Sequence, residues 1–185
     1  RVVDIHAGDH RKPEFLAVNP AGYVPALVTP EGEVLHEAAA IMVYLADRHG
    51  LDELMPPPGD ILRGRFYSHL FFHTSDIQPP SKRSFYPARY ALDPADTERV
   101  RDAARAMARE RWAVLDGFLK ADGPYHLGER FSLLDLHMAL WVNYGLGSTR
   151  DLADEFPAVG DCFARVMARP KSAALLDGVI AALAA

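Results

Sequence analysis

Three prolines and a glycine, in the stretch MPPPGD at residues 55–60, divide the chain into two parts. Proline lacks the N–H that helices and inner strands need, so such a cluster ends the preceding element and is typical of a linker. The residues before it show an α/β pattern, and those after it show only helical ones. The sequence therefore predicts an α/β domain at 1–53, a linker at 54–59 and an all-helical domain at 60–185.

The first part predicts two strands joined by a tight turn, flanked by other short elements. PALVT and EVLH lie on either side of Pro30-Glu31-Gly32, a good hairpin turn. A helix from Glu37 to Arg48 follows and ends at Gly50. Its core-facing residues are Ala39, Ile41, Met42 and Leu45. Upstream, we expect a short strand at Val2, Val3 and Ile5 and a short helix in KPEFLAVNP (12–20), stopped by Asn-Pro.

The second part predicts a bundle of helices. The apolar residues of 60–77 recur at helical spacing and are Ile61, Leu62, Phe66, Leu70 and Phe71. The segment 98–121 is a long amphipathic helix with Val100, Ala104, Met107, Leu115 and Phe118. The segment 131–147 is apolar nearly all round, which predicts a buried central helix. Two further helices are expected around 157–169 and 171–184.

Charge and composition narrow the class of protein. The chain has 185 residues and a net charge of −5, without the basic footprint of a duplex-binding domain, so we expect no nucleic-acid partner. No apolar run approaches the roughly 20 residues of a membrane span, and no basic, apolar leader opens the sequence. The single cysteine, Cys162, excludes an internal disulfide and any cysteine-based zinc cage. It is expected to be a small buried hydrophobe in a cytoplasmic protein.

Histidines offer the other metal ligands. His69 and His73 are four residues apart, as a helical metal pair would be, but no third ligand of suitable spacing accompanies them. We therefore expect no metal, with His69 and His73 at a helix surface or interface and with His126 and His137 structural.

The segment GYVPALVTPEGEVLHEAAAIMVYL (22–45) is the candidate ligand site. A cis Val24-Pro25 bond would turn the Val24 N–H and C=O outward to pair with a bound peptide, whereas a trans bond would make Pro25 an ordinary strand start. Glu37 at a helix start is favoured by the helix dipole in any protein. It could also hold a ligand ammonium while the first helical N–H groups hold a carboxylate.

Two motifs carry a family resemblance. NPAGYVPALVTPEGEVLHEAAAIMVYLADRHG resembles the glutathione-binding half of the cytosolic glutathione transferases, bacterial type, and YHLGERFSLLDLHMAL resembles the start of their buried C-terminal helix. The resemblance covers nearly the whole chain. It implies a partial thioredoxin-like N-terminal domain followed by a glutathione-transferase-type helical bundle. The family's first strand and helix, with its catalytic Ser, Tyr or Cys, would precede Arg1, so the catalytic residue is not identified.

The resemblance also implies roles for individual residues. Val24, with Pro25, would bind the cysteinyl backbone of glutathione, and Glu37 its γ-glutamyl ammonium. His10 would act on the glycyl carboxylate, and Tyr23 stands where many members carry Lys or Gln for similar work. Ser132 and Asp135 would form a capping box, in which Ser132 accepts from the Asp135 N–H and Asp135 reaches back.

Ala38 is a departure from the family, which has Ser after the acidic residue. A hydroxyl bond to a carboxylate contributes about 1.5–3 kcal/mol, so its loss predicts roughly tenfold to hundredfold weaker binding. The Ala38 N–H keeps part of the contact.

The resemblance implies an enzyme that activates the glutathione thiol for attack on a small electrophile. Electrophile-cleft candidates are Tyr67, Phe71, Lys82, Arg83 and Tyr86, the last three within SKRSFYPARY (81–90), a basic loop with aromatics. The alternative is a non-catalytic binding or assembly module of the same fold. A thiol reductase is disfavoured because Cys162 lies in the helical half. Glutathione is the expected co-substrate, and a homodimer without membrane contact the expected assembly.

Overall fold

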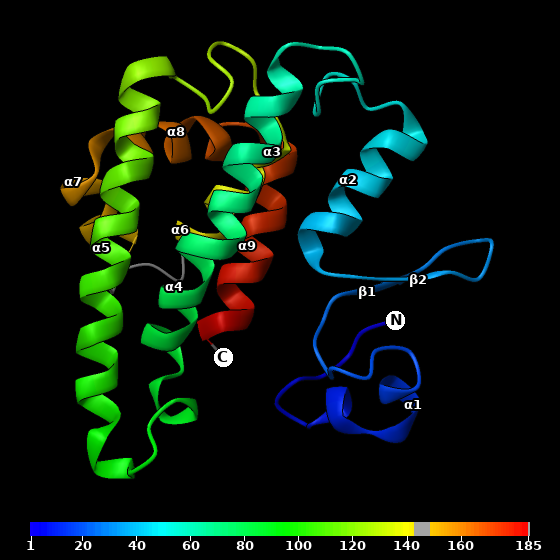
Figure 1. Ribbon diagram of the computed structural model, residues 1–185, viewed down its shortest axis with the longest axis vertical. Helices are drawn as coiled ribbons and strands as arrows, with labels where there is room; N and C mark the ends of the chain where they lie inside the picture. The colour runs from blue at the N-terminus through cyan, green and yellow to red at the C-terminus, as the bar shows by residue number, and fades with distance from the viewer. Residues whose placement is uncertain (143–148, 185) are drawn as a thin grey trace. The chain divides into compact units, whose positions relative to one another are not determined.

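A computed structural model describes residues 1–142 and 149–184 (Figure 1). Within it the chain forms two compact units, Arg1–Met55 and Pro56–Ala185, and the division lies within segment 54–59. Each unit has its own internal packing.

The first unit is built around a hairpin and one helix. Its elements are η1 (Asp9–Arg11), α1 (Pro13–Leu16), β1 (Ala26–Val28), β2 (Val34–His36) and α2 (Ala38–His49). The strands are antiparallel, with Ala26 opposite His36 and Val28 opposite Val34. Gly32 has a φ of 91° in the turn, and Gly50 has a φ of 59° where α2 ends, so both need glycine's conformational freedom. The predicted hairpin and helix are confirmed.

The predicted strand at Val2, Val3 and Ile5 is wrong. These residues form an extended segment followed by turns, and β1 and β2 pair only with each other in the part of the chain that is described. An apolar run becomes a strand only when a neighbouring strand takes up its N–H and C=O groups. The described chain supplies no such neighbour here.

The second unit is helical throughout. Its elements are α3 (Leu62–Phe72), η2 (His73–Ile77, one π-helical turn), α4 (Gln78–Phe85), η3 (Pro87–Arg89), η4 (Pro94–Asp96), α5 (Thr97–Asp122), α6 (Leu133–Val142), α7 (Thr149–Glu155), α8 (Pro157–Met167) and α9 (Pro170–Ala184). The helices expected near 98–121, 157–169 and 171–184 are confirmed, and α7 adds one that the pattern did not indicate. The predicted helix 131–147 is confirmed up to Val142, and its remainder falls outside the described residues.

The segment SKRSFYPARY is a helix followed by a 3-10 turn, and its prediction as a loop is wrong. The helix predicted for 60–77 continues through η2 into α4, which ends at Phe85. Two prolines stand in the first turn of α4, directly after the π-helical turn of η2, and the backbone stays helical across the junction. The Ser81 hydroxyl donates to the Ile77 carbonyl at 2.7 Å and adds a bond across the junction.

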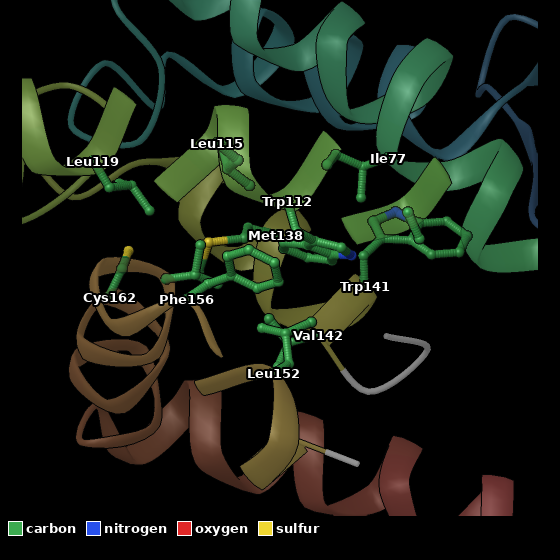
Figure 2. Packing of buried hydrophobic residues seen from close by; sticks show 12 residues of the cluster. Ile77, Trp112, Leu115, Leu119, Met138, Trp141, Val142, Leu152, Phe156 and Cys162 are labelled. Atoms are coloured by element: carbon green, nitrogen blue, oxygen red, sulfur yellow. The ribbon is translucent and has the colours of Figure 1, made fainter. Parts of the chain in front are cut away.

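The core of the second unit lies between α5, α6 and α8. Figure 2 shows Trp112 from α5 beside Met138 from α6, with Phe156 close to both. Cys162 is fully buried in this cluster, as predicted. Three residues of the predicted apolar faces instead point to solvent: Ile61 (93% exposed), Phe71 (64%) and Met107 (43%). In α5, Ala104, Ala108 and Trp112 supply the buried face.

None of the described helices combines the length and the apolar character needed to cross a membrane.

Candidate functional site

Asn19 shapes the turn that leads into the candidate ligand site. Its side chain is buried, and its amide donates to the Tyr23 carbonyl at 2.6 Å while its oxygen accepts from the Ala21 N–H at 3.1 Å. Gly22, at a φ of 65°, completes the turn. The Asn-Pro signal therefore fixes the path of the chain immediately before Val24.

Val24 presents free backbone groups beside the start of α2. The Val24-Pro25 peptide bond is cis. No hydrogen bond within the described residues takes up the Val24 N–H or C=O. Because Ala26 pairs with His36 as the last pair of the hairpin, Pro25 and Glu37 directly adjoin this pair, and Val24 and the start of α2 follow at the same end of the hairpin. Two places that are thirteen residues apart in sequence therefore meet at one end of the hairpin.

Glu37 holds a strained backbone at the head of α2. Its φ of 67° and ψ of 118° make it the one non-glycine residue with positive φ in the described chain. Such a conformation costs on the order of 1–3 kcal/mol and is concentrated at functional sites. Glu37 is exposed, its side chain makes no capping bond, and the first intrahelical bond runs from the Ile41 N–H to the Glu37 carbonyl. Its carboxylate and the N–H groups of Ala38 to Ala40 can therefore receive a ligand.

His10 and Arg11 lie against the same turn. A Cβ on Gly22 would stand 2.8 Å from the Arg11 Nη1 and 3.1 Å from the His10 carbonyl, so η1 approaches the turn closely because residue 22 is glycine. The Arg11 guanidinium lies 5.8 Å from the centroid of the exposed Tyr23 ring. The His10 Nδ1 is buried and has no hydrogen-bond partner in the described chain. The first unit thus gathers His10, Tyr23, Val24, Pro25, Glu37 and Ala38 in one region.

Charges in this region suit a zwitterionic peptide. Glu37 supplies a carboxylate for an ammonium, and the opening turn of α2 supplies N–H groups and the positive end of the helix dipole for a carboxylate. Arg11 supplies a cation beside Tyr23, the residue before Val24. The free Val24 backbone can pair with an extended peptide as an added strand.

The residues predicted to line the electrophile cleft lie on α3, on α4 and, for Tyr86, directly after α4. Tyr67 and Phe71 share a face of α3, and the Tyr67 hydroxyl accepts from the Arg63 Nη2 at 2.6 Å. On α4, the Lys82 ammonium lies 5.9 Å from the Trp141 ring and the Arg83 guanidinium 5.7 Å from the Tyr90 ring. The partly buried Tyr86 ring lies 4.1 Å from the Arg89 guanidinium. These contacts join the α4 cations to aromatic rings other than Tyr67 and Phe71.

The start of α6 has a capping arrangement that differs in one bond from the expectation. Asp135 Oδ2 accepts from the Ser132 N–H at 2.7 Å and from the Ser132 hydroxyl at 3.1 Å. The Ser132 Oγ accepts from the Leu134 N–H at 3.3 Å, while the Asp135 N–H donates to the Ser132 carbonyl. The Ser132 hydroxyl thus accepts from the Leu134 N–H instead of the Asp135 N–H, and it still caps a backbone donor in the first turn of α6.

Comparison with known proteins identifies this combination of units. Residues 1–48 match the family model for the glutathione S-transferase N-terminal domain, and residues 73–170 match the model for the C-terminal domain. The chain belongs to the glutathione S-transferase family. Its fold is a partial thioredoxin-like glutathione S-transferase N-terminal unit with two strands, followed by the family's helical C-terminal domain.

Solved structures of bacterial glutathione transferases resemble the chain over most of its length. One from Methylococcus capsulatus str. Bath is 31% identical, with a TM-score of 0.69, and the match covers 89% of this chain and 77% of that protein. A homologue from Sulfitobacter with bound glutathione is 27% identical, with a TM-score of 0.77, covering 96% and 84%. One from Burkholderia graminis, with two glutathione molecules bound per subunit, is 27% identical, with a TM-score of 0.80, covering 96% and 76%.

Within this glutathione S-transferase fold, the histidines of the second unit are buried. Of the two positions predicted for His69 and His73, a helix surface or an interface, the helix surface is wrong. His69 is 8% exposed, His73 1%, His126 1% and His137 4%. The His73 Nε2 lies 3.0 Å from the His126 Nε2, and the His126 Nδ1 lies 2.8 Å from the Asp135 Oδ1. His73 meets partners 53 and 64 residues further along, which local spacing does not reveal.

One buried group of the described residues has ligand atoms close enough for a metal ion: His126, Asp135 and Cys162. The hydrogen bonds at Asp135 argue against assigning it that role. Its Oδ1 accepts from the His126 N–H and Nδ1 and contacts the Cys162 Sγ at 3.5 Å, while its Oδ2 accepts twice from Ser132. Burial raises the pKa of the Cys162 thiol, which disfavours the thiolate that a metal would need. The hydrogen-bond donors of His126 and Ser132 therefore suit an Asp135 carboxylate that is held by hydrogen bonds rather than by a metal ion.

Two features of the first unit went unnoticed in the sequence pattern. Arg11 follows His10 directly, and only the close packing on Gly22 reveals that it faces Tyr23. The strain at Glu37 left no signal either, because a positive φ is usually signalled by Gly or Asn. The sequence signal that could have indicated the strained turn is a Glu between a strand and a helix start, where a capping residue is usually found.

Proposed function

We propose that this family member binds glutathione through its first unit and is a glutathione-dependent transferase. The observation that supports this most is the meeting of the free Val24 backbone with the strained Glu37 at the head of α2. Strain of this kind is retained where a conformation serves a ligand. Glutathione transferases from Sulfitobacter and Burkholderia graminis were solved with glutathione bound, which favours the same ligand.

In this proposal each part of the tripeptide has a partner. The Val24 N–H and C=O pair with the cysteinyl residue, and Glu37 binds the γ-glutamyl ammonium. The N–H of Ala38 binds the γ-glutamyl carboxylate, and His10 with Tyr23 faces the glycyl end. The backbone pairing fixes the direction of the peptide, and the charges at its γ-glutamyl end fix which peptides fit.

The chemistry proposed is attack of the glutathione thiolate on a small electrophile. A free thiol near pKa 8.5 is only a few per cent thiolate at pH 7, so a group that donates a hydrogen bond to the sulfur raises the reactive fraction. That group is the catalytic Ser, Tyr or Cys that the resemblance places before Arg1. The residues proposed to line the cleft for the electrophile are Tyr67, Phe71, Lys82, Arg83 and Tyr86. We also propose a homodimer in a reducing cytoplasm.

Titration calorimetry with reduced glutathione tests the binding proposal. Glu37→Gln removes the charge that pairs with the ammonium, and a lost charged bond of about 1.5–3 kcal/mol predicts roughly tenfold to hundredfold weaker binding. Glu33→Gln is the matched control, because Glu33 is an exposed carboxylate at the other end of β2. Equal affinity of the two variants, or no heat with the unmodified chain, would overturn the proposal.

A non-catalytic binding module of the same fold is the second candidate. Ala38 favours it because the carboxylate contact lacks the family's hydroxyl, and Tyr23 favours it because it replaces a Lys or Gln. Turnover of an aryl halide with glutathione by the protein supports the transferase. Glutathione binding without turnover across a panel of electrophiles supports the module.

A further inference from the structure

The second unit contains a connected chain of buried imidazoles that the proposed function does not use. The His137 Nδ1 lies 3.3 Å from the His73 Nδ1, the His73 Nε2 lies 3.0 Å from the His126 Nε2, and the His126 Nδ1 lies 2.8 Å from Asp135. His69 lies at the side of this chain, its ring 5.8 Å from that of His126. We call His137, His73, His126 and Asp135 the histidine relay.

One set of neutral tautomers satisfies the whole relay. If His126 donates from Nδ1 to the Asp135 carboxylate, its Nε2 is an acceptor. His73 then donates to it from Nε2, which leaves the His73 Nδ1 to accept from the His137 Nδ1–H. Each of the three contacts has one donor and one acceptor. The relay is therefore complete when its histidines are neutral and Asp135 is ionised.

Added protons have little compensating charge. Among the described residues, Asp135 supplies the one carboxylate in direct contact with the relay histidines, and a charge on His126 would pair with it. Other titratable or charged groups on the surrounding elements are already paired or stacked with groups outside the relay: Arg65 with Asp122 beside His69, Asp76 of η2 with Arg111 of α5, Asp116 with Lys120 on α5, and Lys82 over Trp141. On α8, Cys162 contacts Asp135 and lies near Arg165. The described part of α9 packs on α6 through Leu176. His73 and His137 thus face other imidazoles and no carboxylate.

A second proton breaks the relay. One extra proton is accommodated if the tautomers shift so that the charged ring donates from both nitrogens. Two adjacent charged rings would place N–H against N–H at 3.0 or 3.3 Å, so one contact must open. Burial lowers the pKa of His73 well below its usual range and lowers the pKa of His137 and of His69 to about 4, each with neighbouring imidazoles adding to the effect.

The relay is tied to the start of α6 through Asp135. This carboxylate accepts from the backbone N–H groups of His126 and Ser132, and these bonds hold segment 123–132 to the first turn of the buried helix. We propose that the histidine relay is a pH-sensitive latch: neutral, it holds segment 123–132 and the start of α6 against η2, and as the pH falls below about 6 their release becomes more favourable because the opened state takes up protons.

Urea unfolding of the 185-residue chain at pH 7.5 and 5.5 tests the latch. A histidine that is neutral in the folded state but protonated in the unfolded state lowers the stability of the fold as the pH falls below its unfolded pKa of 6.5. Each contributes about a tenfold loss in the folding equilibrium constant per pH unit below that value, so His69, His73 and His137 together predict roughly a 10³-fold loss at pH 5.5. His73→Leu should reduce this loss about tenfold. His49→Gln, an exposed histidine on α2, should leave it unchanged.

Hydrogen exchange locates the effect. After correction for intrinsic rates, the amides of His126 and Ser132 should lose protection between pH 7.5 and 5.5, well before that of Leu115 in the α5 core. If His73→Leu does not fold, the imidazole C2–H resonances of the unmodified chain decide. The latch predicts that three of them stay at their neutral positions down to pH 5.5 while the fold persists. Equal stability at both pH values, uniform loss of protection, or ordinary titration of all eight histidines would overturn the proposal.

Discussion

Glu37 and Ala38 form the turn on which the proposed ligand site depends. Glu37 carries a backbone conformation that most residues avoid, and it gains no capping bond in return. Ala38 supplies an N–H at the helix start but no hydroxyl. The strain and the missing hydroxyl lead to separate expectations, one for stability and one for affinity.

Replacing Glu37 by glycine should stabilise the chain while weakening glutathione binding. Glycine adopts positive φ without the penalty that Glu pays, so the free energy of unfolding should rise by about 1 kcal/mol after the extra entropy of unfolded glycine is counted. Chemical denaturation measures the gain and calorimetry the loss of affinity. A destabilised variant with unchanged affinity would show that the strained turn serves the fold.

Ala38→Ser should restore the hydroxyl that the family resemblance leads us to expect. The added bond to the ligand carboxylate predicts roughly tenfold to hundredfold tighter glutathione binding, from about 1.5–3 kcal/mol. Ala40→Ser, two residues further into α2, is the control and should leave the affinity within twofold. Similar gains in both variants would mean that the effect does not come from the helix start.

At the scale of elements, α7 and α8 approach each other through a glycine inside a helix. A Cβ at Gly160 would lie 2.8 Å from the Ala153 Cβ and 3.1 Å from its Cα. Gly117, inside α5, has open space around the same position. Both glycines weaken their helices by about 1 kcal/mol relative to alanine, so only Gly160 has a packing reason to be there.

Gly160→Ala and Gly117→Ala should therefore change stability in opposite directions. In Gly160→Ala, the new methyl group pushes α7 away from α8. Overpacking of this kind costs about 1–3 kcal/mol, which outweighs the gain in helix propensity. The second should raise the free energy of unfolding by up to about 1 kcal/mol. Thermal or urea unfolding measures both. A stabilised Gly160→Ala chain would show that the two helices are not held at this distance in solution.

Local pattern predicted the elements whose signals lie within a few residues. Pro30-Glu31-Gly32 indicated the hairpin, and the spacing of 98–121 indicated α5, because turn chemistry and helical periodicity are local properties. The prediction of a strand at Val2 to Ile5 was wrong because a strand depends on a partner strand elsewhere in the chain. The prediction of SKRSFYPARY as a loop was wrong because its first half continues the helical backbone of η2 into α4, which the basic and aromatic residues of the segment do not indicate.

At the scale of the whole molecule, the two units differ in what their polar groups do. The first unit leaves the Val24 backbone and the Glu37 carboxylate without partners among the described residues. The second unit joins the histidine relay and Ser132 to one another by hydrogen bonds. Sequence reasoning found the segments of the first site because one motif contains most of it. It missed the histidine relay, whose members come from three separate segments of the chain: η2, segment 123–132 and α6.

The central claim is that the Val24 backbone and the head of α2 hold one ligand together. Amide chemical shifts recorded while glutathione is added to the 185-residue chain test it directly. The account predicts that the amides of Val24 and Ala38 shift together along one binding curve, while the amide of Leu115 in the helical core stays unchanged. Shifts at only one of the two places, or separate curves for them, would contradict it.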